Sequence, residues 1–518
     1  MNLSPQKRAF LAGTLLLTTT GFLCRILGFF YRIYLSRTIG AEGLGLYNMV
    51  HPVFGICFAL CAGSIQTAVS QCVAANIKKG KSFFVAGLTI SLSMSVLLAA
   101  VIWQSADFLA ARVLLEKRCA PLLPYIAISV PCSAVHACIN GYYYGMQKTR
   151  VPAFSQLTEQ LVRMGAVFLI ADIMVERGIQ ITVQLAVMGH LAGEAASSLY
   201  TILAICLFGP KCAAAETLKG SAAGSACNAA SWKEPYVPLM SMALPLMGNR
   251  LVLNLLASAE AIWIPNRLQA FGLSSSEALN VYGVLTGMAL PFILFPSAIT
   301  NSVAVLLLPT VAKAQAEGNK KQISSTISMS IRYSLYMGIL CIGIFTIYGF
   351  NLGTSVFHNR DAGAFIVTLA WLCPFLYLST TTGSILNGLG KTATTFLQNV
   401  SALIMRLSFV LFAIPKYGIL ALLWGMLASE LFLSFLHLYS LKKLVPFSWN
   451  AWNMIIKPGV LLSISIGITK FLASLEITAN LLRPLHGFLN ICIQVCILIG
   501  CYGGLLLTFH KGKREKKR

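Results

Sequence analysis

The chain has 518 residues, of which 57% are hydrophobic and only 11% are charged. Soluble globular domains carry about 25% charged residues, so a chain this poor in charge cannot cover a water-facing surface, and lipid must be its solvent. The formal net charge of +23 would suggest nucleic acid in a soluble protein. Here the basic residues lie in short gaps between apolar runs, which indicates membrane topology, and no nucleic-acid partner is expected.

Apolar runs separated by charged or Gly/Pro-rich breaks predict the membrane-spanning helices, because an apolar helix needs about 20 residues to cross the bilayer. Six spans are predicted first, at 9–34, 44–74, 83–103, 119–146, 153–174 and 182–208. Eight more follow, at 236–264, 280–309, 324–350, 364–388, 392–414, 418–440, 455–474 and 485–509. The predicted fold class is an all-α membrane protein with about fourteen transmembrane helices.

The basic residues outside these spans alternate from loop to loop. The N-terminus, the even-numbered loops and the tail 511–518 hold more than twice as many Lys and Arg as the odd-numbered loops. By the positive-inside rule, both termini are predicted to be cytoplasmic. A miscount of one helix would destroy this alternation, so it supports an even number of spans.

A weak internal repeat divides the chain into similar halves. Asn140-Gly141, Lys148-Thr149, Gln156 and Arg163 are echoed by Asn387-Gly388, Lys391-Thr392, Gln398 and Arg406. We predict two pseudo-symmetric six-helix lobes plus two C-terminal helices, of the kind that rock about a midplane site. The predicted parts are an N-terminal lobe 1–208, a cytoplasmic linker 209–235, a C-terminal lobe 236–445, helices thirteen and fourteen at 446–510, and a basic cytoplasmic tail 511–518.

Charged residues inside the spans mark the candidate site, because an intramembrane Arg costs several kcal/mol unless it faces a cavity or a partner. Arg25 and Arg32 are nearly two turns apart on one face of the first span. The others are Arg163, which shares a face with Gln156, Glu159 and Gln160, and Arg250, which opens a polar stripe with Asn254 and Ser258. A cavity lined by these four arginines would suit an anionic substrate, since guanidinium binds phosphate oxygens in a bidentate manner.

Simpler explanations exist for the same residues. Arg163 could pair with Glu159 one turn away, and Arg32 could extend its side chain to the outer membrane surface. Glu194, Glu260 and Glu430 could be proton or cation sites, although structural hydrogen bonding is favoured. The fifteen cysteines lie mostly in apolar runs without His or acidic partners, so we expect no metal and no cofactor.

Several stretches resemble a known family. They are Arg25–Arg32, Arg37–Tyr47, Gly63–Ser70, Gln156–Arg163 and Gly283–Pro291. Together they closely resemble the stage V sporulation protein B family. This family belongs to the polysaccharide-transporter branch of the multidrug/oligosaccharidyl-lipid/polysaccharide flippase superfamily, and is similar to the lipid II flippases.

The resemblance implies a function and a site. It implies alternating access that moves an undecaprenyl-pyrophosphate-linked sugar precursor during spore cortex or cell-wall synthesis, with membrane lipids and cell-wall synthesis proteins as partners. It also implies a bacterial cytoplasmic membrane and a cationic cavity, whose helix-1 arginines match Arg25 and Arg32. The predicted substrate-binding residues are therefore Arg25, Arg32, Glu159, Arg163, Arg250 and Asn254.

Three other classes remain open. An ion-coupled multidrug exporter of the same superfamily would use an acidic cavity, which Glu159, Glu194 and Glu260 could supply. A membrane-embedded glycan polymerase or ligase would need catalytic residues in sizeable outer loops. The odd-numbered loops are short and nearly free of His and acidic pairs, so no enzyme and no catalytic residue is expected. The third class is a scaffold without transport activity.

Overall fold

The computed structural model describes residues 5–208, 235–474 and 487–515, so most of the predicted linker and the last residues of the tail lie outside it. Every regular element in these ranges is helical. Within them, fourteen helices are long and apolar enough to cross a membrane. The predicted fold class is therefore confirmed.

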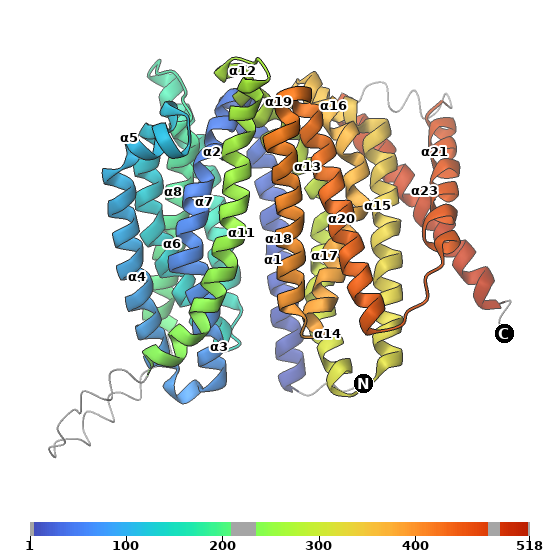
Figure 1. Ribbon diagram of the computed structural model, residues 1–518, viewed down its shortest axis with the longest axis horizontal. Coiled ribbons are helices and arrows are strands. Elements are labelled where there is room, and N and C mark those ends of the chain that lie inside the picture. Colours follow the sequence, from blue (N-terminus) through green and yellow to red (C-terminus); the bar gives the residue numbers. More distant parts are fainter. Residues whose placement is uncertain (1–4, 209–234, 475–486, 516–518) are drawn as a thin grey trace. The chain divides into compact units, whose positions relative to one another are not determined.

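The helices form two compact units. Unit 1 comprises residues up to 39 and 46–262; unit 2 comprises residues 40–45 and from 263 onward. The main elements of unit 1 are α1 (Pro5–Thr38), α2 (Gly40–Phe58), the π-helical turn η1 (Ala59–Gly63), α3 (Ser64–Ala75), α4 (Gly80–Gln104), α6 (Leu123–Gly145), α7 (Arg150–Glu176), α8 (Gln184–Phe208) and most of α11 (Tyr236–Ala270). In Figure 1 the long helices of this unit, coloured blue to green, run in roughly the same direction.

The main elements of unit 2 follow α11 in the chain. They are α12 (Ser275–Gly283), η5 (Val284–Ala289), α13 (Leu290–Leu294), α14 (Ser297–Ala316), α15 (Lys320–Phe357), α16 (Arg360–Leu369), α17 (Cys373–Gly388), α18 (Thr392–Ser408), η7 (Phe409–Ala413), α19 (Ile414–Tyr417), α20 (Ile419–Leu444), η8 (Trp452–Ile456), α21 (Lys457–Ser474) and α23 (Gly487–Glu515). The division between the units falls within α2 and α11. The predicted lobe boundaries stay a prediction.

Two of the predicted spans differ in the structure. The span predicted at 280–309 is interrupted, because α13 ends at Leu294 and Pro296 precedes the first residue of α14. The span predicted at 153–174 is the continuous helix α7, which is not among the fourteen apolar helices. Its stripe of Gln and charged residues makes it more polar than its neighbours.

Each unit has its own apolar core. In unit 1, buried side chains of α3, α4, α6 and α11 pack together, for example Ile65, Val69 and Leu239. In unit 2, α14, α15, α17 and α20 do the same, with Ile327, Ile385 and Leu441 fully buried. Large apolar side chains also lie exposed on the outside of the helices, as expected where hydrocarbon replaces water as the solvent.

The turns after α6 and α17 have the same hydrogen bonds, as the internal repeat predicts. Lys148 N donates to Tyr143 O at 2.9 Å, and Lys391 N donates to Leu386 O at 2.9 Å. Gln147 and Gly390 occupy matching positions and both have positive φ, at 58° and 73°. The repeat is therefore visible in local structure.

Reporter fusions can test which side of the membrane the basic loops and the C-terminus face. A fluorescent protein fused to the C-terminus should be bright, and alkaline phosphatase at the same place should be inactive, because the basic tail is predicted to stay in the cytoplasm. Phosphatase fused after His358, in an odd-numbered loop, should be active. The opposite pattern at both positions would contradict the predicted orientation.

Candidate substrate-binding site

The first part of the site lies where α1 packs on α7, the two helices that carry Arg25, Arg32, Glu159 and Arg163. The helices approach closely at Gly28, where an added Cβ would lie 3.4 Å from Nε2 of Gln160. Gly28 lies between the two α1 arginines on nearly the same helical face. That face of α1 is therefore directed toward α7.

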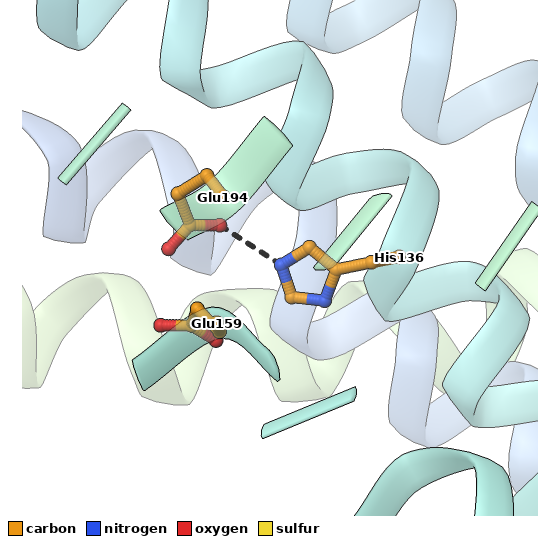
Figure 2. A group of neighbouring side chains, drawn as sticks. All are labelled: His136, Glu159 and Glu194. Atoms are coloured by element: carbon orange, nitrogen blue, oxygen red, sulfur yellow. Dashed lines mark hydrogen bonds and ion pairs between the residues drawn. The ribbon is translucent and has the colours of Figure 1, made fainter. Parts of the chain in front are cut away.

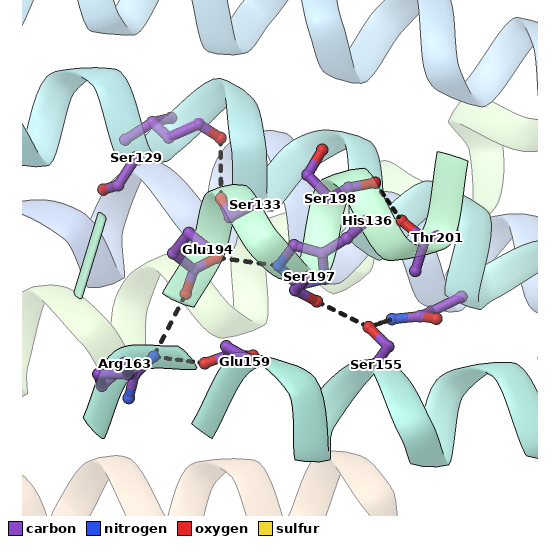
Figure 3. Close-up of polar contacts among 12 residues, drawn as sticks. Ser129, Ser133, His136, Ser155, Glu159, Arg163, Glu194, Ser197, Ser198 and Thr201 are labelled. Atoms are coloured by element: carbon purple, nitrogen blue, oxygen red, sulfur yellow. Dashed lines mark hydrogen bonds and ion pairs between the residues drawn. The ribbon is translucent and has the colours of Figure 1, made fainter. Parts of the chain in front are cut away.

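Arg163 is held by two carboxylates. Its Nη2 forms an ion pair with Glu159 on the same helix, and it lies 3.8 Å from Oε1 of Glu194 on α8 (Figure 3). Glu194 also accepts a hydrogen bond from Nε2 of His136 on α6, at 2.9 Å (Figure 2). Ion pairs and hydrogen bonds offset the cost of placing charge in a low-dielectric interior.

A layer of neutral polar groups continues from this network along α6, α7 and α8. Asn140 donates to Ser155 Oγ at 3.2 Å. Ser155 shares a hydrogen bond of 2.7 Å with Ser197 (Figure 3). All three side chains are buried. Hydrogen-bonded side chains of this kind join helices inside a membrane bundle.

Arg32 lies in the same neighbourhood as Arg163. The two guanidinium groups are close enough to influence one another electrostatically, and both act on Tyr31 and Tyr47. His51, one turn after Tyr47 on α2, is within electrostatic reach of both arginines. The structure thus brings Arg32, Arg163 and Glu159 together in unit 1.

Arg25 is the most accessible of the predicted arginines. Its side chain is exposed. It makes no hydrogen bond or ion pair within the part of the chain that the structure describes. It lies nearly two turns before Arg32 on the same face of α1. Arg25 could therefore also approach an anion that is bound at Arg32.

Arg250 and Asn254 of α11 lie against the segment formed by α2, η1 and α3. Arg250 Nη2 donates to Thr67 Oγ1 at 3.0 Å, and its other terminal nitrogen lies over Gly63, where an added Cβ would be only 2.2 Å away. Asn254 donates to Arg250 O at 2.8 Å, and its Oδ1 lies beside Gly55. Glycines in α2 and η1 therefore make room for the polar stripe of α11.

Five of the six predicted residues consequently form two groups in unit 1. The first contains Arg32, Glu159 and Arg163 on the packed helices α1 and α7, and the second contains Arg250 and Asn254 beside α2 and η1. Arg25 lies on α1 outside both groups. The Arg163–Glu159 pair, considered as a simpler explanation, is present. Substrate binding by these residues stays a prediction.

Sequence reasoning missed His136, the partner of Glu194. A histidine in the middle of an otherwise apolar span was a usable signal, because ionisable residues at membrane depth usually have a partner. Glu430, considered together with Glu194, accepts a hydrogen bond from Ser379 at 3.1 Å in unit 2.

Fourteen apolar helices among the described residues, with charged side chains packed between them, define a polytopic membrane protein as the class. The chain belongs to the polysaccharide biosynthesis protein family, whose model matches residues 10–314. It is 28% identical over 451 residues to stage V sporulation protein B of Bacillus subtilis (strain 168), covering 85% of each chain. It is 22% identical over 422 residues to the lipid II flippase MurJ of the same organism, covering 77% of this chain and 76% of MurJ.

Solved structures show the same fold. A structure of the lipid II flippase MurJ in an inward closed conformation matches with a TM-score of 0.71 at 14% identity, covering 97% of this chain and 100% of that one. An inward-facing MATE family multidrug resistance transporter of the MOP superfamily matches with a TM-score of 0.62 at 14% identity, covering 80% and 93%. The resemblance seen in the sequence is confirmed, and the relatives named for an activity are transporters rather than enzymes.

The buried network of His136, Glu159, Arg163 and Glu194 should contribute more to stability than a surface ion pair does. Glu194→Ala would remove the buried partner of His136 and one of the two carboxylates that hold Arg163, so we expect a loss of about 3 kcal/mol, measured as lower thermal stability in detergent micelles. Glu317→Ala is the matched control, because Glu317 forms an exposed 3.7 Å pair with Lys313 and its removal should change little. Equal effects in the two variants would mean that the network is not a stability element.

Proposed function

We propose that this protein is a flippase for an undecaprenyl-pyrophosphate-linked peptidoglycan or polysaccharide precursor in the bacterial cytoplasmic membrane, with both termini cytoplasmic. Alternating access would expose the site first to the cytoplasm and then to the outside, while the lipid tail stays in the bilayer. The observation that carries this proposal is that α1, which bears Arg32, packs on α7, which bears Arg163, within unit 1. The family membership and the flippase relatives support it.

The pyrophosphate group is the part of the substrate that these arginines would hold. Guanidinium groups offer paired N–H donors that match phosphate oxygens, and such charge-assisted bonds are about twice as strong as neutral ones. Glu159 forms an ion pair with Arg163. A phosphate oxygen would replace this carboxylate partner, so the arginine exchanges one anion for another and is never left unpaired.

The remaining predicted residues would extend the site. Arg25 would meet the head group first, because it is exposed and lies on the same face of α1 as Arg32. Arg250 and Asn254 would contact the head group or the first sugar beside α2, once the arginine leaves Thr67. Sugar hydroxyl groups can accept hydrogen bonds from both the neutral amide of Asn254 and the charged guanidinium of Arg250.

The membrane potential can drive the transport. Moving one charge through 100 mV is worth about 2.3 kcal/mol, and a pyrophosphate leaving an inside-negative cell moves downhill. A nucleotide-hydrolysing domain is therefore unnecessary for outward movement. Because a relative over most of the chain is named stage V sporulation protein B, we place the function in spore cortex or cell-wall synthesis, where cell-wall synthesis proteins would be its partners.

The proposal can be tested in liposomes that contain labelled lipid II. The wild-type protein should move the label to the outer leaflet, and faster with an imposed potential. Arg32→Gln and Arg163→Gln should each slow transport roughly 10- to 100-fold, the effect of losing a charge-assisted bond to phosphate. Arg406→Gln is the matched control, since Arg406 is the repeat counterpart of Arg163 and lies on α18 of unit 2. Equal rates in all four proteins would contradict the site.

An ion-coupled multidrug exporter is the second candidate function. The buried carboxylate Glu194 and its neighbour Glu159 favour it, because acidic residues can bind cationic drugs or coupling ions. The fold likeness to a MATE family transporter points the same way.

Expression in a drug-hypersensitive bacterial host separates the two functions. A flippase should leave the inhibitory concentrations of cationic dyes and antibiotics unchanged. An exporter should raise them several-fold, and Glu194→Gln should abolish the increase because it removes the negative charge. A clear increase without lipid II transport would favour the exporter.

A further inference from the structure

Four ionisable side chains from three helices form one contact network in unit 1. They are His136 of α6, Glu159 and Arg163 of α7, and Glu194 of α8. One ligand atom each from His136, Glu159 and Glu194 lies within 4.8 Å of the others. Figure 2 shows the imidazole directed at the Glu194 carboxylate, with the Glu159 carboxylate nearby.

The network is graded in its accessibility. The side chains of Glu159 and Arg163 are 21% and 16% exposed, whereas those of His136 and Glu194 are 11% and 6% exposed. Glu159 and Arg163 therefore form the more accessible part of the network, and His136 and Glu194 form its more buried part.

The ring of His136 has one free basic atom. Its Nε2 lies 2.9 Å from Oε2 of Glu194, and an ionised carboxylate requires an N–H there. Its Nδ1 is buried and has no hydrogen-bond partner among the described residues. In the neutral ring this Nδ1 carries a lone pair, so it is the atom at which a proton can be added.

A charge count indicates when that proton would bind. Before a substrate binds, Arg163 contacts Glu159 and Glu194, and Arg32 brings a second positive charge to the same neighbourhood around Tyr47. Two positive and two negative charges then lie there, and His136 can remain neutral. A bound pyrophosphate adds at least two negative charges and takes over the arginines, which leaves the carboxylates uncompensated. Because an unbalanced buried charge is costly, the site then gains free energy by taking up a proton.

A proton fits this site better than a metal ion does. The Arg163 guanidinium contacts the carboxylates of both Glu159 and Glu194, so a cation bound to these carboxylates would lie next to it. Two like charges so close together repel one another strongly in a low-dielectric interior. A proton on Nδ1 of His136 lies on the far side of the ring from Glu194 and does not displace the guanidinium.

Other titratable or charged groups lie near the network on α1, α2, α6 and α8. They are Cys24, Tyr31 and Arg32 of α1, Tyr47 and His51 of α2, Cys132 of α6, and His190 of α8. Among them, only Arg32 carries a fixed charge. The substrate would also neutralise Arg32, which strengthens the coupling between substrate binding and proton uptake.

We propose that His136 takes up one proton at Nδ1 when an anionic pyrophosphate head group binds Arg32 and Arg163, so that substrate and proton binding stabilise one another. The proton comes from water, no bond is broken in the substrate, and Nε2–H continues to donate to Glu194. The linkage rests on the proposed function, whereas the proton site itself does not. By reciprocity, a lower pH must then tighten substrate binding by the same factor as substrate increases proton affinity.

The first test needs no substrate. Infrared difference spectra between about pH 5 and pH 8 should show an imidazole protonation band in the wild-type protein in nanodiscs. His136→Gln should remove part of this band, because glutamine can still donate to Glu194 but cannot take up a proton. His437→Gln is the matched control for another buried histidine, which lies on α20 of unit 2. Identical wild-type and His136→Gln spectra would overturn the proton site.

The second test counts protons on ligand binding. Farnesyl pyrophosphate is titrated into the protein by calorimetry in two buffers of different ionisation enthalpy. We expect uptake of about one proton per ligand in the wild type and in His437→Gln, and little uptake in His136→Gln. Glu194→Gln should also lower the uptake, because it removes the carboxylate that stabilises the imidazolium. Binding heats that do not depend on the buffer in the wild type would overturn the linkage.

The two tests separate the two proposals. If farnesyl pyrophosphate does not bind and lipid II is not transported, the proposed function fails, while the infrared result still decides the proton site. If ligand binds and lipid II moves but His136→Gln keeps the wild-type proton uptake, the linkage fails and the proposed function stands.

Discussion

The structure depends on the requirement that charge inside a bilayer be matched by opposite charge. Arg163 meets it with Glu159 on its own helix and Glu194 on the next one, and Glu194 in turn binds His136. These contacts connect α6, α7 and α8 through polar bonds in a place where the hydrophobic effect does not draw helices together. The same contacts hold the guanidinium near Arg32, so packing and substrate binding would use one set of groups.

Much of the fold could be predicted from the sequence, because the length and apolarity of a spanning helix are local properties. The span at 418–440 corresponds to α20, Ile419–Leu444, for this reason. The interruption before α14 was harder to predict. Although Pro296 was visible, a proline within a spanning helix often causes only a kink, as Pro52 shows by lying inside the continuous α2.

The site could be predicted only in part. Residues four apart on a helix face one another, so the Arg163–Glu159 contact could be foreseen from spacing alone. The contact between His136 and Glu194 joins residues 58 apart and depends on how α6 packs on α8. Likewise, nothing in the spacing of Arg250 indicates that Gly63 would lie beneath its guanidinium, because that contact requires the tertiary structure.

The polar character of α7 has a consequence for biogenesis. A charged residue at the centre of a helix raises its free energy of insertion by the translocon by about 2.5–3.5 kcal/mol, and α7 carries both Glu159 and Arg163. Pairing these two side chains before the helix leaves the channel lowers that cost. The apolar helix α8, whose Glu194 completes the network, follows immediately in synthesis. We therefore expect α7 and α8 to enter the bilayer as a hairpin, so that the late-emerging helix retains the early one in the membrane.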